Sequence, residues 1–211
     1  MSKEFNISCI YMIQDVVSGH YLSENCVDST SKIYCNAKFS NNVSHSNTEM
    51  FVVSPYNNAG VADAFTIRNV ATHDILGVKF GGPNGIEGEA IFFKNTTIYD
   101  SSNVFGVSCV RVDDNEFSYN YYIYDFTNST LSSLAENCDN VTLECPATFD
   151  IIIYGQKEPR IVSFYEHCNT SSSLVGGDFS NFYPDVVCSY SDLPTVLGAV
   201  CLGVLAALWG V

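Results

Sequence analysis

One pattern recurs three times along the chain and constrains its fold more than any other feature. It spans residues 11–23, 65–78 and 121–131, and each copy places an aromatic residue two positions before an isoleucine and an Asp or Asn two positions after it. A repeat of this kind is typical of architectures in which each copy is one supersecondary unit. The sequence therefore predicts three similar units.

Strand and turn signals divide the units in the same order. The predicted strands lie at 9–15, 21–22, 33–34 and 50–53, then at 65–69, 75–80, 90–94 and 104–110. The aromatic residues that open the first and last strands are 40 residues apart in both units, Tyr11 with Phe51 and Phe65 with Phe105. In the third unit, with strands near 121–131, 141–143 and 149–153, we match Tyr121 with Phe149, which are 28 apart, and ascribe the difference to a shortened loop.

Three units of four strands without helical periodicity predict an all-β chain with the β-trefoil fold, a barrel capped by hairpins. We expect this domain to occupy residues 1–154, an irregular disulfide-bonded extension residues 155–192, and a hydrophobic tail residues 193–211. A length of 211 residues suits one such domain. The net charge of −14, with nine Lys and Arg in total, argues against a nucleic-acid partner.

The cysteine content predicts disulfides and an oxidising compartment. Nine cysteines occur, of which Cys201 lies in the tail, leaving Cys9, Cys26, Cys35, Cys109, Cys138, Cys145, Cys168 and Cys188. Cys26 with Cys35 and Cys138 with Cys145 fit within hairpins, and Cys9 with Cys109 and Cys168 with Cys188 follow by elimination, although eight cysteines allow about 105 pairings. Because no C-x-x-C or H-x-x-x-H pair occurs, we expect no metal site.

Two further features indicate the cell surface. Six N-x-S/T sequons, useful only in the secretory pathway, begin at Asn6, Asn42, Asn95, Asn128, Asn140 and Asn169. The uncharged tail behind a polar spacer predicts a glycosylphosphatidylinositol attachment signal, with a transmembrane tail or a core helix as alternatives. No signal peptide is visible after Met1, so we expect the true start to lie upstream.

The opening strands at 11–23 and 65–78 resemble those of ricin-B-type β-trefoil lectins, whose usual form is Y-x-I-x-N-x-x-S/T-G-x-Y-L. The resemblance covers about residues 9–154. The family's sugar-binding repeats end in Q-x-W, and we match these positions here to Glu49-Met50-Phe51, Asn103-Val104-Phe105 and Ala147-Thr148-Phe149. The aromatic core residue is kept as Phe, whereas the polar one differs, so the fold is better supported than any sugar site.

The resemblance implies pockets beside the second and third strands of a unit, where an acidic or amide residue accompanies an aromatic ring. By position, these residues are Glu24, Tyr34, Asn36 and Asn47 in the first unit, and Phe92, Phe93 and Asn95 in the second. Ordinary hairpin surface is an equally good interpretation of them. The repeated Asp15, Asn69 and Asp125 need only a structural role, since an Asx side chain can bond the backbone of its own turn.

An enzyme is not expected, and neither is a cofactor. The histidines His20, His45, His73 and His167 are scattered, and no G-x-S-x-G or similar nucleophile motif occurs. His73 and Asp74 are adjacent, so on a strand their side chains would point to opposite faces.

The sequence therefore favours a secreted or surface-displayed lectin-like domain that binds glycans or glycoproteins without catalysis, with a membrane contact through the tail. Two alternatives remain. One is a protease inhibitor that presents the loops at 41–47 or 81–88 to its target, and the other is a structural or adhesive glycoprotein in which the trefoil is only a scaffold.

Overall fold

The computed structural model describes residues 5–26, 33–41, 47–56, 64–80, 88–94, 101–111, 117–125, 132–138, 144–151, 161–168 and 183–184. Within these ranges the chain is all-β, with two single-turn 3-10 helices, η1 (Asn47–Glu49) and η2 (Ser101–Asn103). No helix in the described part is long and apolar enough to cross a membrane. The predicted tail, its anchor and most of the extension after residue 154 lie outside the described residues.

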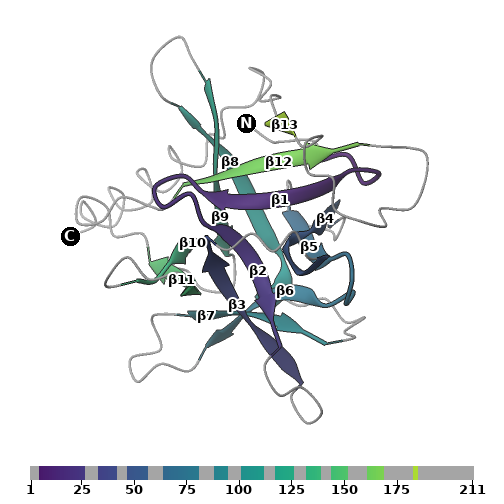
Figure 1. Cartoon of the computed structure of the whole chain (residues 1–211), viewed down its shortest axis with the longest axis vertical. Coiled ribbons are helices and arrows are strands. Elements are labelled where there is room, and N and C mark those ends of the chain that lie inside the picture. The colour runs from purple at the N-terminus through teal and green to yellow at the C-terminus, as the bar shows by residue number, and fades with distance from the viewer. Residues whose placement is uncertain are drawn as a thin grey trace, which may run out of the picture.

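Strands from all parts of the described chain form one closed ring (Figure 1). Each strand of the ring pairs antiparallel with the next, and the last pairs with the first. In ring order the strands are β1 (Ile10–Asp15), β4 (Phe51–Pro55), β5 (Ala64–Asn69), β8 (Phe105–Arg111), β9 (Phe117–Asp125) and β12 (Val162–His167). A short strand, β13 (Tyr183–Pro184), pairs with β12 outside the ring. The ring is a closed barrel, so these strands have no free edge toward one another.

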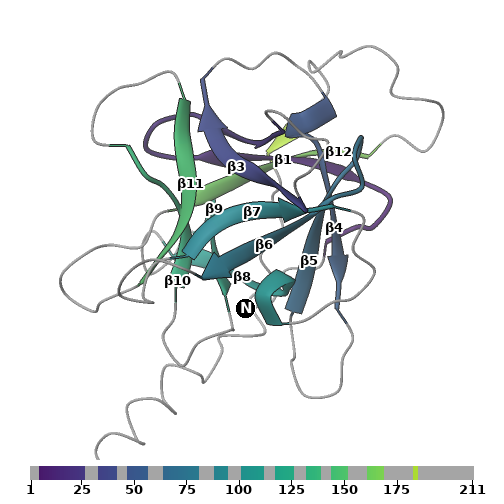
Figure 2. The ribbon, with the colours of Figure 1, turned by 90° about the horizontal axis from the view of Figure 1, so that it is seen from below.

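Three hairpins lie together on one side of the ring (Figure 2). They are β2 (Tyr21–Asn25) with β3 (Tyr34–Ser40), β6 (Ile75–Phe80) with β7 (Gly88–Phe93), and β10 (Ser132–Glu136) with β11 (Glu144–Ile151). The second strand of each hairpin also pairs with the second strands of the other two, β3 with β7, β7 with β11 and β11 with β3. Each hairpin is thus tied to both of its neighbours.

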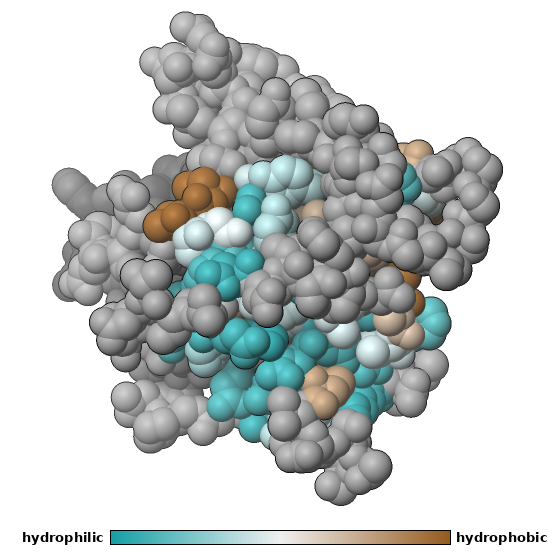
Figure 3. Space-filling model, in the orientation of Figure 1, coloured by the Kyte–Doolittle hydropathy of each residue, from teal (hydrophilic) through white to brown (hydrophobic). Residues whose placement is uncertain are grey.

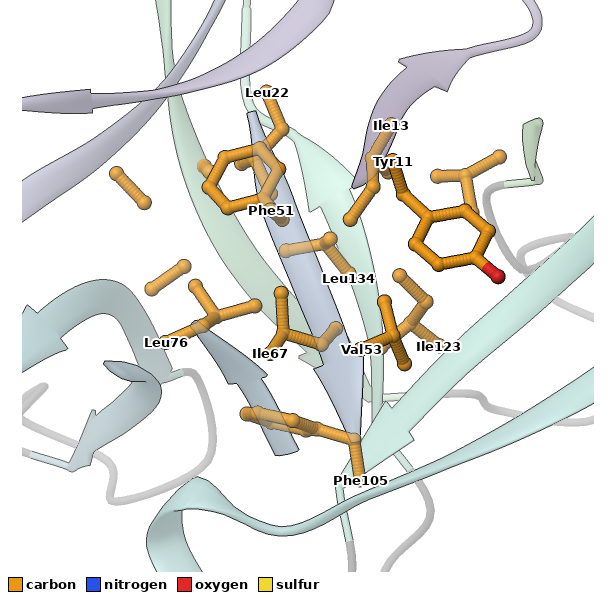
Figure 4. Close-up of a cluster of buried hydrophobic side chains, with 14 of the residues drawn as sticks. Tyr11, Ile13, Leu22, Phe51, Val53, Ile67, Leu76, Phe105, Ile123 and Leu134 are labelled. Atoms are coloured by element: carbon orange, nitrogen blue, oxygen red, sulfur yellow. The ribbon is translucent and has the colours of Figure 1, made fainter. Parts of the chain in front are cut away.

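The buried side chains repeat in threes because equivalent strand positions face the interior. Each of four such layers contains one residue from each unit, and all twelve side chains are at most 2% exposed. The layers are Ile13, Ile67 and Ile123; Leu22, Leu76 and Leu134; Phe39, Phe92 and Phe149; and Val53, Val107 and Phe164. Figure 4 shows the isoleucine and leucine layers beside Phe51 and Phe105. The core is therefore a product of the sequence repeat.

Two aromatic stacks cross the boundaries between units, which we call seams. Phe51 of the first unit stacks on Phe92 of the second, with ring centroids 5.7 Å apart and planes within 8°. Phe105 of the second unit stacks in the same way on Phe149 of the third, at 5.2 Å. Packing of this kind joins each unit to the next.

The third unit differs from the prediction. Tyr121 lies opposite Val162, just as Tyr11 lies opposite Phe51 and Phe65 opposite Phe105. The true distance is therefore 41 residues, close to the 40 of the other units, and the expected shortened loop is wrong. Phe149 instead lies opposite Leu134 on a hairpin.

The segment predicted to be irregular also contains a barrel strand. β12 (Val162–His167) lies beyond residue 154 and closes the ring by pairing with β1 and β9. A strand that pairs with two others on the ring is part of the barrel, so the irregular reading of this stretch is wrong. The sequence concealed it because Val162 stands where the first two units carry phenylalanine.

The disulfides confirm two expected pairings and overturn two. Cys26 is bonded to Cys35 and Cys138 to Cys145, each within a hairpin as predicted. Cys9 is bonded to Cys168, with Cα atoms 4.3 Å apart, so the pairings Cys9–Cys109 and Cys168–Cys188 are wrong. The register of β1 with β12 explains this, because Ile10 lies opposite His167 and the two cysteines flank that pair.

Candidate functional site

One outward face of the hairpins gathers three of the seven predicted sugar-binding residues. Tyr34 on β3 lies opposite Phe93 on β7, and Asn36 lies opposite Ile91. Side chains of directly opposed residues in an antiparallel pair point to the same side. Tyr34, Asn36 and Phe93 therefore share one face, and Lys79 on β6 and Glu89 on β7 join it because they oppose each other in register. Figure 3 shows a largely hydrophilic surface where these hairpins lie in Figure 1.

Lys79 links the two units at this face. Its ammonium donates a hydrogen bond to the Tyr34 hydroxyl at 2.9 Å and lies 3.1 Å from a Glu89 carboxylate oxygen. It is 4.8 Å from the centre of the Tyr34 ring. The hydrogen bond to Tyr34, and then the one to Glu89, raise the pKa of Lys79 above its usual range, so the ammonium stays charged at neutral pH.

The Tyr34 ring is half-buried and Asn36 and Glu89 are exposed. An aromatic ring beside a carboxylate, an amide and an ammonium offers one apolar surface with hydrogen-bond donors and acceptors around it. This combination can hold a small polar molecule with one apolar side. We call Tyr34, Asn36, Lys79 and Glu89 the β3–β7 face.

Phe93 borders the β3–β7 face and depends on a glycine. A Cβ built on Gly77 would collide with the Phe93 ring and would lie 3.0 Å from the Ser102 carbonyl oxygen of η2. The ring therefore occupies the space that a side chain at residue 77 would fill. Gly77 is used here for close packing of a neighbour.

Two predicted residues do not reach this face. Phe92 is fully buried and stacks on Phe51, so its ring is a core group and its assignment to a sugar site is wrong. Its neighbour Phe93 points outward because adjacent residues on a strand face opposite sides.

Glu24 is 4% exposed and points into the seam between the first and second units, away from Tyr34. Asn95 lies outside the described residues, and of Asn47 the structure describes only the backbone, within η1.

Glu24 meets the turn that precedes β6. Its Oε2 accepts a hydrogen bond from the Thr72 hydroxyl at 2.6 Å. Its carboxyl group also faces that of Asp74, itself buried, and the oxygens of the two groups lie within 4.8 Å of one another. Burial, partly offset by the hydrogen bond from Thr72 and reinforced by the nearby Asp74, raises the pKa of Glu24 to about 7.

The seam between the third and first units carries an equivalent contact. Glu136 stands on β10 where Glu24 stands on β2, two residues after the buried leucine of each. It accepts a hydrogen bond from the Ser18 hydroxyl, and its Oε1 lies 2.7 Å from Nδ1 of His20. At the seam between the second and third units the equivalent residue is Val78, which is buried. Among the described side chains, a carboxyl group is therefore buried at this strand position at two of the three seams.

The repeated Asx residues have the structural role expected of them. Asp15 Oδ1 accepts hydrogen bonds from the backbone amides of Val17 and Ser18. Asn69 Oδ1 accepts the equivalent bonds from Ala71 and Thr72. The side chain of Asp125 lies outside the described set.

Sequence reasoning missed Lys79 and Glu89. The signal that could have found them is the alternation along each strand, because Lys79 follows the buried Val78 and Glu89 precedes the buried Ala90. The register of β6 with β7 then places Lys79 opposite Glu89.

Among the predicted sequons, Asn6 is described and exposed, and the other five lie outside the described ranges.

Three clusters of His, Cys, Asp and Glu side chains in the described part are close enough to share a metal ion. Each includes at least one disulfide-bonded cysteine, namely Cys26 with Cys35, Cys9 with Cys168, or Cys145. A sulfur in a disulfide is not a thiolate, which is the form that binds metals. These clusters are therefore weak metal sites.

The likeness to known proteins is one of fold. No family model matches the chain, and no curated protein matches its sequence. A Caenorhabditis elegans protein of unknown function is 13% identical with a TM-score of 0.53, over 74% of this chain and 92% of its own. The Macrolepiota procera ricin B-like lectin, solved in complex with lactose, is 14% identical with a TM-score of 0.51, over 77% and 98%. A Culex quinquefasciatus salivary protein of the Cysteine and Tryptophan-Rich family is also 14% identical, with a TM-score of 0.50, over 78% and 97%. At such identities these similarities show a shared all-β fold.

Proposed function

We propose that this chain is a β-trefoil of the ricin-B-like kind that binds carbohydrate without catalysis, through the β3–β7 face. The ring of strands with three mutually paired hairpins supports the trefoil. The disulfides are consistent with an extracellular location, where such bonds persist.

The observation that carries the proposal is the grouping of Tyr34 with Lys79 and Glu89. A sugar ring has an apolar side that can stack on an aromatic ring and hydroxyl groups that donate to a carboxylate and accept from an ammonium. Tyr34, Glu89 and Lys79 supply one group of each type on neighbouring strands. The fold shared with a lectin that was solved in complex with lactose is a second, weaker support.

The test is glycan-array binding of the folded, disulfide-intact chain, followed by calorimetry with the best glycan. We expect Tyr34→Ala to weaken binding about two- to tenfold, because an aromatic contact contributes about 0.5–1.5 kcal/mol and about 1.4 kcal/mol is tenfold in affinity. Tyr165→Ala is the matched control, since Tyr165 is also half-buried but lies on β12 and bonds Gln14. It should leave binding unchanged.

Two results would contradict the proposal. One is a folded protein that binds no glycan, and the other is a glycan whose affinity is the same for Tyr34→Ala and for the unaltered chain. Inhibition of a papain-like or trypsin-like protease, without glycan binding, would favour the inhibitor alternative, whose loops lie almost wholly outside the described residues.

A further inference from the structure

Two carboxyl groups meet inside the seam between the first and second units. Glu24 ends the buried part of β2 and Asp74 directly precedes β6, and each side chain is 4% exposed. Their oxygens lie within 4.8 Å of one another. Two ionised carboxylates can only accept hydrogen bonds and repel each other, whereas a carboxyl group that carries a proton can donate to its neighbour. This arrangement therefore favours the state of the pair that holds a proton.

The groups that face Glu24 come from three segments. Thr72 and Asp74 approach from the turn between β5 and β6, and Lys94 approaches from the end of β7 as the nearby cation. A sulfur of the Cys26–Cys35 disulfide lies 3.1 Å from Oε1 of Glu24. Burial and Asp74 disfavour the ionised form of Glu24, whereas Thr72 and Lys94 favour it. The effects of burial and Asp74 are together the larger, so the pKa of Glu24 is raised to about 7.

The equivalent contact at the seam between the third and first units is chemically different. There Glu136 faces the imidazole of His20, at 2.7 Å, rather than a second carboxyl group. A facing pair of carboxyl groups is therefore found in the described part of the chain at the seam between the first and second units and not at the seam between the third and first units.

The seam that holds the two carboxyl groups also divides the β3–β7 face. Tyr34 belongs to the first unit, and Lys79 and Glu89 belong to the second. Glu24 lies opposite Ala37 on the strand that carries Tyr34, and Asp74 adjoins the strand that carries Lys79. A change in the packing of Glu24 against Asp74 therefore affects both β3, which carries Tyr34, and β6, which carries Lys79.

We propose that the Glu24–Asp74 contact is a pH-sensitive clasp that holds the first and second units together while it carries a proton and loosens when the proton is lost. The effect on ligand binding rests on the proposed function, whereas the effect on stability does not. Glu24 titrates near pH 4.5 when unfolded and near 7 when folded. The folded state therefore binds the proton more tightly, so this contribution to stability is full below about pH 4.5 and is lost as pH rises through 7.

The test is urea unfolding of the full chain at pH 5 and pH 8, with Glu24→Gln as the variant. Gln keeps the size of the side chain and cannot ionise. We expect the folding equilibrium constant of the unaltered chain, relative to that of Glu24→Gln, to fall about tenfold or more between the two pH values. The control is Glu144→Gln, an exposed carboxylate paired with Lys38, which should follow the unaltered chain. Parallel pH dependence of Glu24→Gln and the unaltered chain would overturn the clasp.

Two further measurements keep the test decisive. Asp74→Asn removes the like charge that faces Glu24 and should reduce the pH dependence, though less completely than Glu24→Gln, because the burial of Glu24 remains. Carbon-13 NMR titration of the unaltered chain needs no variant, and the absence of any Glu carboxyl group titrating above pH 6 would refute the clasp.

Measurement of glycan affinity at two pH values separates the proposed carbohydrate binding from the proposed clasp. With a glycan that binds, we expect weaker affinity at pH 8 than at pH 6 for the unaltered chain and equal affinities for Glu24→Gln. Equal affinities for both proteins would show that the clasp does not act on the face. If no glycan binds, the proposed function fails while the stability and NMR measurements still decide on the clasp.

Discussion

Single residues set the turns of this fold through their backbone conformation. The turn after Asp15 and the turn after Asn69 have the same hydrogen bonds, Asp15 with His20 and Asn69 with Asp74. The fifth residue of each has a positive φ, 75° at Gly19 and 62° at His73. Glycine adopts this conformation without steric cost, whereas a side chain with a Cβ is strained in it.

His73→Gly should therefore stabilise the protein. We expect the free energy of unfolding to rise by about 0.5–1 kcal/mol, since relief of strain exceeds the extra chain entropy of glycine. His73 is exposed, so little packing is lost. Urea unfolding measures the change, and Gly19→Ala, the matched opposite substitution, should lower stability by about 1 kcal/mol. Loss of stability in His73→Gly would contradict the argument.

Individual residues also show which features can be predicted from the sequence and which cannot. Asp15 and Asn69 were predictable because a local Asx turn needs only neighbouring residues. Phe92 and Phe93 were not distinguished, because which of two adjacent aromatics faces the core depends on the register of β7 with β3 and β6. Glu24 was assigned to a surface that it does not reach, since its partners Thr72 and Asp74 are about fifty residues away in the chain.

At the scale of elements, the disulfides act on very different lengths of chain. Cys9–Cys168 ties β1 to β12, where the ring closes, and spans 159 residues, whereas Cys138–Cys145 spans 7 within one hairpin. A crosslink stabilises chiefly by restricting the unfolded chain, so the longer loop gains more.

Removing Cys9–Cys168 should therefore cost more than removing Cys138–Cys145. We expect the double Ala variants to lose about 5 kcal/mol and about 2.5 kcal/mol of unfolding free energy, respectively, from the loop lengths. Urea unfolding of both variants under non-reducing conditions measures the difference. Equal losses, or a larger loss for the hairpin disulfide, would show that restriction of the unfolded chain is not the dominant effect.

The barrel strands of the first two units were predictable, whereas the last barrel strand of the third unit was not. Residue spacing located β1, β4, β5 and β8 because both units keep an aromatic at the start of the last strand. In the third unit Val162 replaces that aromatic, and Phe149 supplied a false match from a hairpin. A pattern based on residue type fails where packing accepts a smaller side chain, and the pairing with β1 is invisible in a local window.

The whole molecule closes through the pairing of strands that lie far apart in sequence. β1 and β12 pair over six residues each, and β9 pairs with β12 on its other side. A chain that lacks β12 would leave β1 and β9 with unpaired edges, which promote aggregation.

Ending the chain at residue 154 should therefore prevent folding, whereas ending it at residue 192 should not. We expect the shorter chain to lack a cooperative unfolding transition and to bind a dye for exposed apolar surface, because the core loses Phe164 and Val162, both buried. Circular dichroism during urea unfolding compares the two. Cooperative unfolding of the shorter chain would show that β12 is dispensable.

The bond between Cys9 and Cys168 has a mechanical consequence. Tension applied between a point just before residue 9 and a point just after residue 168 passes through one covalent bond and bypasses every barrel strand between them. The hydrogen bonds between β1 and β12, which a pull at this shared end would otherwise open one after another, carry no load while that bond is intact. A reductant therefore changes the protein from a rigid link under force into one that can be drawn out strand by strand.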